Sequence, residues 1–384
     1  MMKNTKLNGN VIVTIEDLRG QEGSCADFRY TYRKEGYSLL FDLDEQSNEL
    51  CCLGLEDYDC RPRKVVVPSE IAGHSVTKIS IGYREDRGDG SFAYNDWIEE
   101  IILPTLLTEI DAFAFSNCTG IEKIIIPENV KKIDVMAFAH CTNLKEVVLP
   151  NSLVDIGDHV FWECVNLKRI EIPKTVEEIG EGILTGCNSV SSIKVAKGNK
   201  MYDSRNNCNA IIRTKDNILI ASCMNTKLPD TVVGWEYAFS RREDIKEYIV
   251  PKSIVIIGNS SFSGCKQLKN IVLHDAVAEI GERAFEFCGL ETITLPSSIT
   301  HIGHRAFMDC KELKTVLLSD SLREIEEYAF FGCTALEELV IPNSVTSIGE
   351  NAFKDCKSLK RIIVKNAALL ENTGISSNVK IIKP

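Results

Sequence analysis

The sequence predicts an α/β repeat fold, a solenoid in which each coil contributes a short strand and a short helical turn. The main evidence is a ladder of cysteines with a constant spacing. A fixed period of about 20–50 residues is typical of one supersecondary unit stacked on copies of itself. The first four ladder cysteines are 23 residues apart, and the other five follow with one step of 22 and three of 23: Cys118, Cys141, Cys164, Cys187, Cys265, Cys288, Cys310, Cys333 and Cys356.

Further apolar columns keep the register of the ladder. In the repeat that contains Cys141, an isoleucine stands eight positions earlier (Ile133), and Ala137 and Phe138 stand four and three positions earlier. Apolar residues that alternate with polar ones and end at a proline, as in residues 169–173, predict a strand of about three to five residues. The Ala-Phe-x-x-Cys segment has helical spacing and predicts one helical turn. All these columns must face inward, because stacking is what makes the core continuous.

The unit L-x-x-I-x-I-P-x-x-V-x-x-I-x-x-x-A-F-x-x-C resembles the BspA-like leucine-rich repeat, which is found in many bacterial surface proteins. The resemblance covers roughly residues 65–365 and is closest in residues 133–167 and 280–359. It implies a right-handed leucine-rich-repeat solenoid with parallel strands on one face. It also implies a protein-binding or adhesion role, and it offers no catalytic motif to carry over.

The breaks in the pattern predict the domain organisation. Residues 1–64 lack the repeat, and two apolar runs around a polar turn at residues 42–48 predict a β-hairpin that caps an N-terminal end. Residues 65–365 form the solenoid, with a variant repeat in which an insertion at about residues 198–230 carries a hairpin around residues 214–217. Residues 366–384 form a C-terminal cap with a closing strand at residues 379–382.

Composition and motifs argue against several classes of function. The net charge of −11 and the lack of a basic cluster disfavour binding of nucleic acid or anionic membranes. No run of 18 apolar residues predicts a membrane-spanning helix. The sequence holds no nucleophile elbow, phosphate-binding loop or zinc-ligand spacing. We therefore expect no enzyme activity, no cofactor and no metal, and a protein as the partner.

The 15 cysteines are expected to be mostly structural. A free cysteine serves as a small buried hydrophobe, and nine of them occupy a core column. Ladder neighbours would lie about 5 Å apart, one strand spacing, but their parallel side chains do not favour disulfides. We therefore expect reduced thiols.

The outward residues of the strands are the best candidates for function. Two of the three outward columns carry charges whose signs largely interleave, as in Lys123, Glu146 and Arg169. The third column is mostly aliphatic, which fits either a partner-binding stripe or strand propensity alone. The candidate protein-binding residues are Ile102, Ile125, Val148, Ile249, Val272, Leu317, Val340 and Ile363.

A loop of the first repeat carries a possible adhesion motif, Arg87-Gly88-Asp89, the tripeptide that integrins recognise. A polar, glycine-containing loop is the simpler interpretation. The N-terminus has no apolar stretch of signal-peptide length, which predicts a cytoplasmic location, whereas the family resemblance predicts the cell surface or secretion. The leading hypothesis is a non-catalytic adhesion or interaction protein. The alternative is a cytoplasmic scaffold or a host-directed effector that binds a protein.

Overall fold

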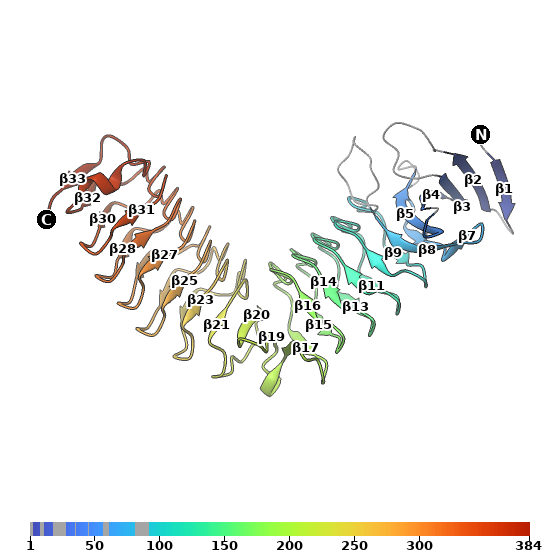
Figure 1. Ribbon diagram of the computed structural model, residues 1–384, viewed down its shortest axis with the longest axis horizontal. Helices are drawn as coiled ribbons and strands as arrows, with labels where there is room; N and C mark the ends of the chain where they lie inside the picture. The colour runs from blue at the N-terminus through green and yellow to red at the C-terminus, as the bar shows by residue number, and fades with distance from the viewer. Residues whose placement is uncertain are drawn as a thin grey trace. The chain divides into compact units, whose positions relative to one another are not determined.

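A computed structural model describes residues 3–7, 11–17, 28–34, 36–44, 46–56, 61–80 and 92–384. The chain divides into two compact units, Met1–Asp203 and Ser204–Pro384. In each unit, successive coils pair through short parallel strands, as Figure 1 shows. The predicted solenoid of parallel coils is therefore confirmed.

From β9 (Glu100–Ile102) onward, each coil of unit 1 contributes one strand of three or four residues and, after a turn, one strand of two residues. The longer strands form a face that we call the strand face, and the two-residue strands form a second parallel sheet. The strands are β1 (Lys3–Leu7), β2 (Val11–Asp17), β3 (Phe28–Lys34), β4 (Tyr37–Asp44), β5 (Glu49–Leu55), β6 (Lys64–Val66), β7 (Glu70–Ile71), β8 (His74–Ile79), β9 (Glu100–Ile102), β10 (Glu109–Ile110), β11 (Lys123–Ile125), β12 (Lys132–Ile133), β13 (Glu146–Val148), β14 (Asp155–Ile156), β15 (Arg169–Ile172), β16 (Glu178–Ile179), β17 (Ser192–Val195) and β18 (Tyr202–Asp203).

The N-terminal strands form an antiparallel meander from β1 to β5. The predicted hairpin around residues 42–48 is confirmed as β4 and β5, and the sequence missed the three strands before it. β5 then pairs in parallel with β8, so the meander continues into the sheet of two-residue strands. The Tyr37 hydroxyl also donates to the carbonyl of Val66 at 3.1 Å and accepts from its N–H at 3.0 Å. These contacts fix the meander against the first coil.

Unit 2 repeats the same coil. Its elements are η1 (Arg205–Asn207), β19 (Ala210–Arg213), β20 (Ile218–Ser222), β21 (Gly234–Trp235), β22 (Glu247–Ile249), β23 (Ile256–Ile257), β24 (Asn270–Val272), β25 (Glu279–Ile280), β26 (Thr292–Thr294), β27 (His301–Ile302), β28 (Thr315–Leu317), β29 (Glu324–Ile325), β30 (Glu338–Val340), β31 (Ser347–Ile348), β32 (Arg361–Ile363), η2 (Ala367–Leu370) and β33 (Lys380–Ile382). The predicted hairpin of the insertion is the antiparallel pair β19–β20, and the predicted closing strand is β33, parallel to β32.

The predicted helical turns, and with them the α/β class, are wrong. The described residues contain no α-helix, and η1 and η2 are short 3-10 segments. In the turn before Cys118, the N–H of Ser116 donates locally to Phe113, but the N–H of Phe115 donates to Ala137 of the next coil at 2.8 Å. An α-helix would need every N–H to bond four residues back. Instead the N–H groups alternate between local and next-coil acceptors, and Phe113 and Asn117 adopt φ of 58° and 60°.

The core consists of the columns that the sequence indicated. Phenylalanines of neighbouring coils stack face to face, as Phe115 and Phe138 do with ring centroids 5.2 Å apart and planes 2° apart. Each ladder thiol also donates a hydrogen bond to a carbonyl of the preceding coil. Cys141 Sγ, for example, lies 3.1 Å from the Phe115 oxygen. The cysteine column therefore combines apolar burial with a polar contact between coils, which alanine could not supply.

Candidate functional site

The strand face carries a column of exposed aliphatic side chains, which we call the apolar stripe. It consists of the predicted third-column residues. Seven of the eight predicted residues are exposed, from 39% for Val148 to 76% for Ile249, and Ile363 beside β33 is half-buried. The exposed members are Ile102, Ile125, Val148, Ile249, Val272, Leu317 and Val340.

Strand register brings the members of the stripe together within each unit. In unit 1, Ile125 pairs with Val148 across β11 and β13. In unit 2, Ile249 pairs with Val272, and Val340 with Ile363. Register neighbours lie about 5 Å apart on one face, so their side chains touch a common partner. Glu171 and Lys194 end the stripe of unit 1 on β15 and β17.

The charged columns beside the stripe are largely paired between coils. Arg169 contacts Glu146 at 2.7 Å, and Lys123 contacts the same carboxylate at 3.3 Å. Hydrogen bonds from Arg169 and then Lys123 lower the pKa of Glu146. In unit 2, Lys360 contacts Glu337 at 2.8 Å. Exposed pairs of this kind stabilise little, so their main effect is to avoid like charges on adjacent strands.

A hollow of about 630 Å³ lies on the strand face of unit 1 where the stripe ends. Val148, Asn151, Glu171 and Lys194 line it, so an apolar side chain adjoins one negative and one positive group. This is the place on the strand face of unit 1 where shape, apolar surface and charge coincide. The column pattern indicated the residues, but it did not reveal that they enclose a concavity.

Arg87, Gly88 and Asp89 lie outside the described residues, so the possible adhesion loop stays a prediction.

Asn95, which stands at a ladder position, is buried, and its carboxamide donates to the carbonyl of Phe92 at 2.7 Å. The neighbouring Trp97 lines a second hollow, which sequence reasoning missed. The signal for it was the lone tryptophan two positions after the replaced cysteine.

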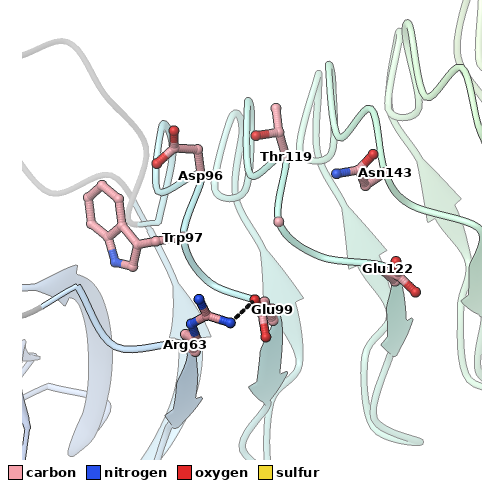
Figure 2. Close-up of a pocket in the computed structure, with 8 residues that line it drawn as sticks. Arg63, Asp96, Trp97, Glu99, Thr119, Glu122 and Asn143 are labelled. Atoms are coloured by element: carbon pink, nitrogen blue, oxygen red, sulfur yellow. Dashed lines mark hydrogen bonds and ion pairs between the residues drawn. The ribbon is translucent and has the colours of Figure 1, made fainter.

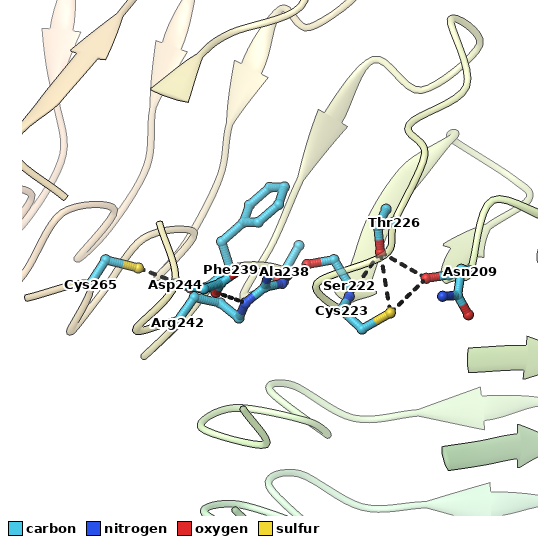
Figure 3. Close-up of polar contacts among 9 residues, drawn as sticks. All are labelled: Asn209, Ser222, Cys223, Thr226, Ala238, Phe239, Arg242, Asp244 and Cys265. Atoms are coloured by element: carbon cyan, nitrogen blue, oxygen red, sulfur yellow. Dashed lines mark hydrogen bonds and ion pairs between the residues drawn. The ribbon is translucent and has the colours of Figure 1, made fainter. Parts of the chain in front are cut away.

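Arg242 replaces a ladder cysteine in unit 2 and remains mostly buried, with 11% of its side chain exposed. Figure 3 shows how its charge is neutralised. Its guanidinium donates to both oxygens of Asp244, at 2.6 and 2.5 Å, and to the Ser222 hydroxyl at 3.3 Å. These bonds lower the pKa of Asp244 despite its partial burial. Arg242 thus links β20 of the insertion to the regular coils of unit 2, and we assign it a structural role.

The ladder thiols are poor nucleophiles. Burial raises the pKa of the Cys141 and Cys310 thiols from 9.0 to about 12, and it raises the pKa of the Cys164 thiol well above 9. Nucleophilic cysteines need the opposite shift, toward the thiolate at neutral pH. The described ladder cysteines are free thiols whose Sγ atoms donate to carbonyls.

These thiols predict a loss of stability at alkaline pH. The pKa of such a thiol is higher in the folded chain than in the unfolded chain. Its contribution to the free energy of unfolding is therefore fully present below about pH 9 and is lost as pH rises toward 12. At pH 10 each such thiol favours the unfolded chain by about 1.4 kcal/mol. We therefore expect the urea midpoint to be constant up to about pH 8 and to fall steeply by about pH 10. Iodoacetamide should label the ladder thiols only as the chain unfolds, and a midpoint that does not change with pH would contradict the assignment.

No group of three His, Cys, Asp or Glu side chains within the described ranges is placed to hold a metal ion. In the same ranges, no helix has the length and apolar character needed to cross a membrane.

Comparison with known proteins agrees with this architecture. The pneumococcal vaccine antigen PcpA is similar in structure, with 17% identity, 92% of this chain and 93% of that chain covered, and a TM-score of 0.50. A leucine-rich cell-surface protein from Faecalibacterium prausnitzii shows 21% identity, coverage of 92% and 94%, and a TM-score of 0.45. A leucine-rich repeat protein from Bacteroides ovatus shows 22% identity, coverage of 90% and 98%, and a TM-score of 0.44. At such identities the likeness to the pneumococcal antigen supports a common fold only.

None of the curated proteins compared with this sequence matches it. The sequence pattern described as the BspA-type leucine-rich repeat region, in six copies, matches residues 85–210 and 235–360. These two stretches make up more than half of the chain, and they contain the strand-face strands from β9 to β17 and from β22 to β30. The chain therefore belongs to the BspA-type leucine-rich repeat family.

Proposed function

We propose that this chain is a non-catalytic solenoid that binds a protein partner through the apolar stripe of its strand face. The observation that carries the proposal is the exposure of aliphatic side chains in register on adjacent strands, such as Ile249 and Val272. Exposed apolar surface that is contiguous and bordered by charge is typical of interaction sites. Leu317 is not β-branched, so strand propensity alone gives no reason for a leucine there.

The paired charges beside the stripe support the same proposal. Glu146 has cationic neighbours on both adjacent coils, and Glu337 has one on the next coil. Their charges are largely compensated within the chain, so a partner needs no opposite net charge to dock. Apolar contact then provides most of the affinity, and the polar border provides orientation.

Lysine substitutions in the stripe test the proposal. Replacing Val148, Leu317 and Val340 with lysine should weaken partner binding by at least about hundredfold, because each lysine must be desolvated at the interface. Folding should be preserved, since exposed substitutions change stability by about 0.5 kcal/mol or less. Binding is measured by capture of proteins from a cell-surface extract on the immobilised chain, followed by titration of the captured partner.

A matched control separates the stripe from the added charge. Asn270→Lys, Thr292→Lys and Thr315→Lys add lysines to exposed positions of the same strand face, in a polar column. This variant should bind nearly as well as the wild type. Equal binding by the stripe variant and the wild type would contradict the proposal, and so would equal loss in the stripe and control variants.

We also infer an adhesive role at the cell surface, supported by the resemblance of the repeat to those of bacterial surface proteins. Proteolysis of intact cells provides the test. The expected result is that an added protease removes the chain from intact cells while a cytoplasmic marker survives. Protection of the chain until the cells are lysed would contradict the surface location and favour the cytoplasmic alternative.

A further inference from the structure

A second hollow, of about 700 Å³, lies in unit 1 between the ladder positions and the strand face. Figure 2 shows Trp97 on one side of it and Asn143 on the other, with Asp96 and Thr119 at one edge. Trp97 and Asn143 come from coils that are two spacings apart, about 10 Å. Its volume falls in the range of small-molecule sites, about 300–1,000 Å³.

Gly120 is the reason that the hollow exists. Trp97, Gly120 and Asn143 stand two positions after the ladder positions of three successive coils. A Cβ atom on Gly120 would lie 2.5 Å from the carbonyl oxygen of Ile98, closer than any real Cβ contact. No side chain at position 120 can therefore project from this coil into the hollow. The hollow is fixed by the backbone and exists without a ligand.

Several polar groups around the hollow are unused. Among the described residues, the side chains of Asp96, Thr119 and Asn143 have no hydrogen-bond partner or ion pair, and Trp97 Nε1 is buried without one. Together they offer a carboxylate, a hydroxyl, a carboxamide and an indole N–H. A buried donor without a partner is costly, so a ligand or water is expected to satisfy it. Asp96 and Asn143 are exposed and can reach a ligand from solvent.

The remaining charges of the hollow are already compensated. Arg63 contacts Glu99 at 2.9 Å, and Lys145 contacts Glu122 at 2.7 Å. The guanidinium of Arg61 lies 5.2 Å from the Trp97 ring centroid, where it makes a cation–π contact. Asp96 is the one carboxylate of the lining without a cationic neighbour among the described residues. Because its cations are already paired, the lining offers little to an anionic ligand, and its free carboxylate, hydroxyl and carboxamide suit a ligand with many hydroxyls.

The geometry points to a saccharide-binding site in this hollow, which takes one neutral sugar ring of a glycan. The apolar C–H face of the ring packs against the indole of Trp97. Neighbouring hydroxyls donate to the Asp96 carboxylate and exchange hydrogen bonds with Asn143 and Thr119. This site is independent of the apolar stripe, because none of its lining residues belongs to the stripe.

Ligand-observed saturation-transfer NMR tests the site with the full chain. The probes are chitotetraose, cellotetraose, mannotetraose and xylotetraose, with tetralysine as a cationic comparison. We expect at least one saccharide to bind with a Kd of about 1 mM, because a single sugar ring makes few contacts in a shallow site. Asp96→Ala should weaken it about tenfold or more, and Asn143→Ala about three- to tenfold.

Asn166→Ala is the matched control, because Asn166 occupies the next position of the same column but lies outside the lining. Its carboxamide donates to the Thr142 carbonyl at 2.9 Å. The control should bind the saccharide like the wild type. Three results would overturn the assignment: no saccharide of the panel binds at about 10 mM, tetralysine binds in its place, or Asn143→Ala and Asn166→Ala have equal effects.

Discussion

Phe285→Ala is expected to destabilise unit 2 by about 3–5 kcal/mol. Phe285 is fully buried, and its ring stacks between Phe262 and Phe307 with centroids 5.6 and 5.2 Å away. Truncation removes buried apolar area, leaves a cavity and breaks two aromatic contacts at once. Urea unfolding followed by circular dichroism measures the effect. Since each coil contacts only its neighbours, hydrogen exchange should increase most in the adjacent coils.

Phe287→Ala is the matched control for this prediction. Phe287 stands two residues later in the same turn, with 44% of its surface exposed and φ of 56°. Alanine keeps the left-handed backbone conformation, so the change removes an exposed ring and little else. Its expected effect is about 0.5 kcal/mol or less. Similar costs for the two substitutions would contradict the assignment of the phenylalanine column to the core.

Gly289→Ala is expected to cost about 2–3 kcal/mol, because the backbone itself must move. Gly289 belongs to the one repeat step of 22 residues, where the turn after Cys288 is a residue shorter. A Cβ atom there would lie 2.0 Å from the carbonyl oxygen of Lys266 in the preceding coil. In the same coil, the Cys288 thiol donates to the Cys265 carbonyl at 3.3 Å and not to a phenylalanine carbonyl.

A one-residue insertion tests that explanation. Inserting an asparagine between Gly289 and Leu290 restores the 23-residue step, in which Lys266 and Lys311 occupy the position of Gly289. In the chain that carries the insertion, adding Gly289→Ala should leave the urea midpoint of unfolding nearly unchanged. A substitution that costs the same in both backgrounds would show that the shortened turn is not the cause.

The sequence predicted the core and the strand face well, because periodicity reports directly which side chains face inward. The columns of Phe138 and Cys141 are buried, and the third-column residues such as Val148 are exposed. The family was equally accessible, since the repeat motif recurs with most of its columns intact. The insertion hairpin followed from two apolar runs around a polar turn.

Helical turns were predicted because an inward residue every three or four positions is compatible with more than one backbone path. Spacing does not report where an N–H donates. In the turns, alternate N–H groups such as that of Phe115 reach the next coil, which a sequence window of one repeat cannot show. The two-residue strands, such as β10, were missed for the same reason, since two residues carry no periodicity.

The hollow at Trp97 was not predictable from columns alone. Its residues come from four coils, and it stays open because Gly120 has no side chain. The replacement of a ladder cysteine by Asn95 marked this repeat as unusual, but only the backbone contact with Ile98 shows that the space stays open. The stripe, in contrast, follows from one column read along the chain.

Site-specific photo-crosslinking is the most direct test of the central claim that the apolar stripe binds a protein. Benzoylphenylalanine replaces Leu317 on the stripe or, as a control, Ala276, an exposed residue outside the strands. Each chain is irradiated with the surface extract, and adducts are identified by mass spectrometry. The account predicts one dominant partner adduct at position 317 and none at position 276. An adduct of equal yield at position 276, or none at position 317 while the partner is bound, would contradict it.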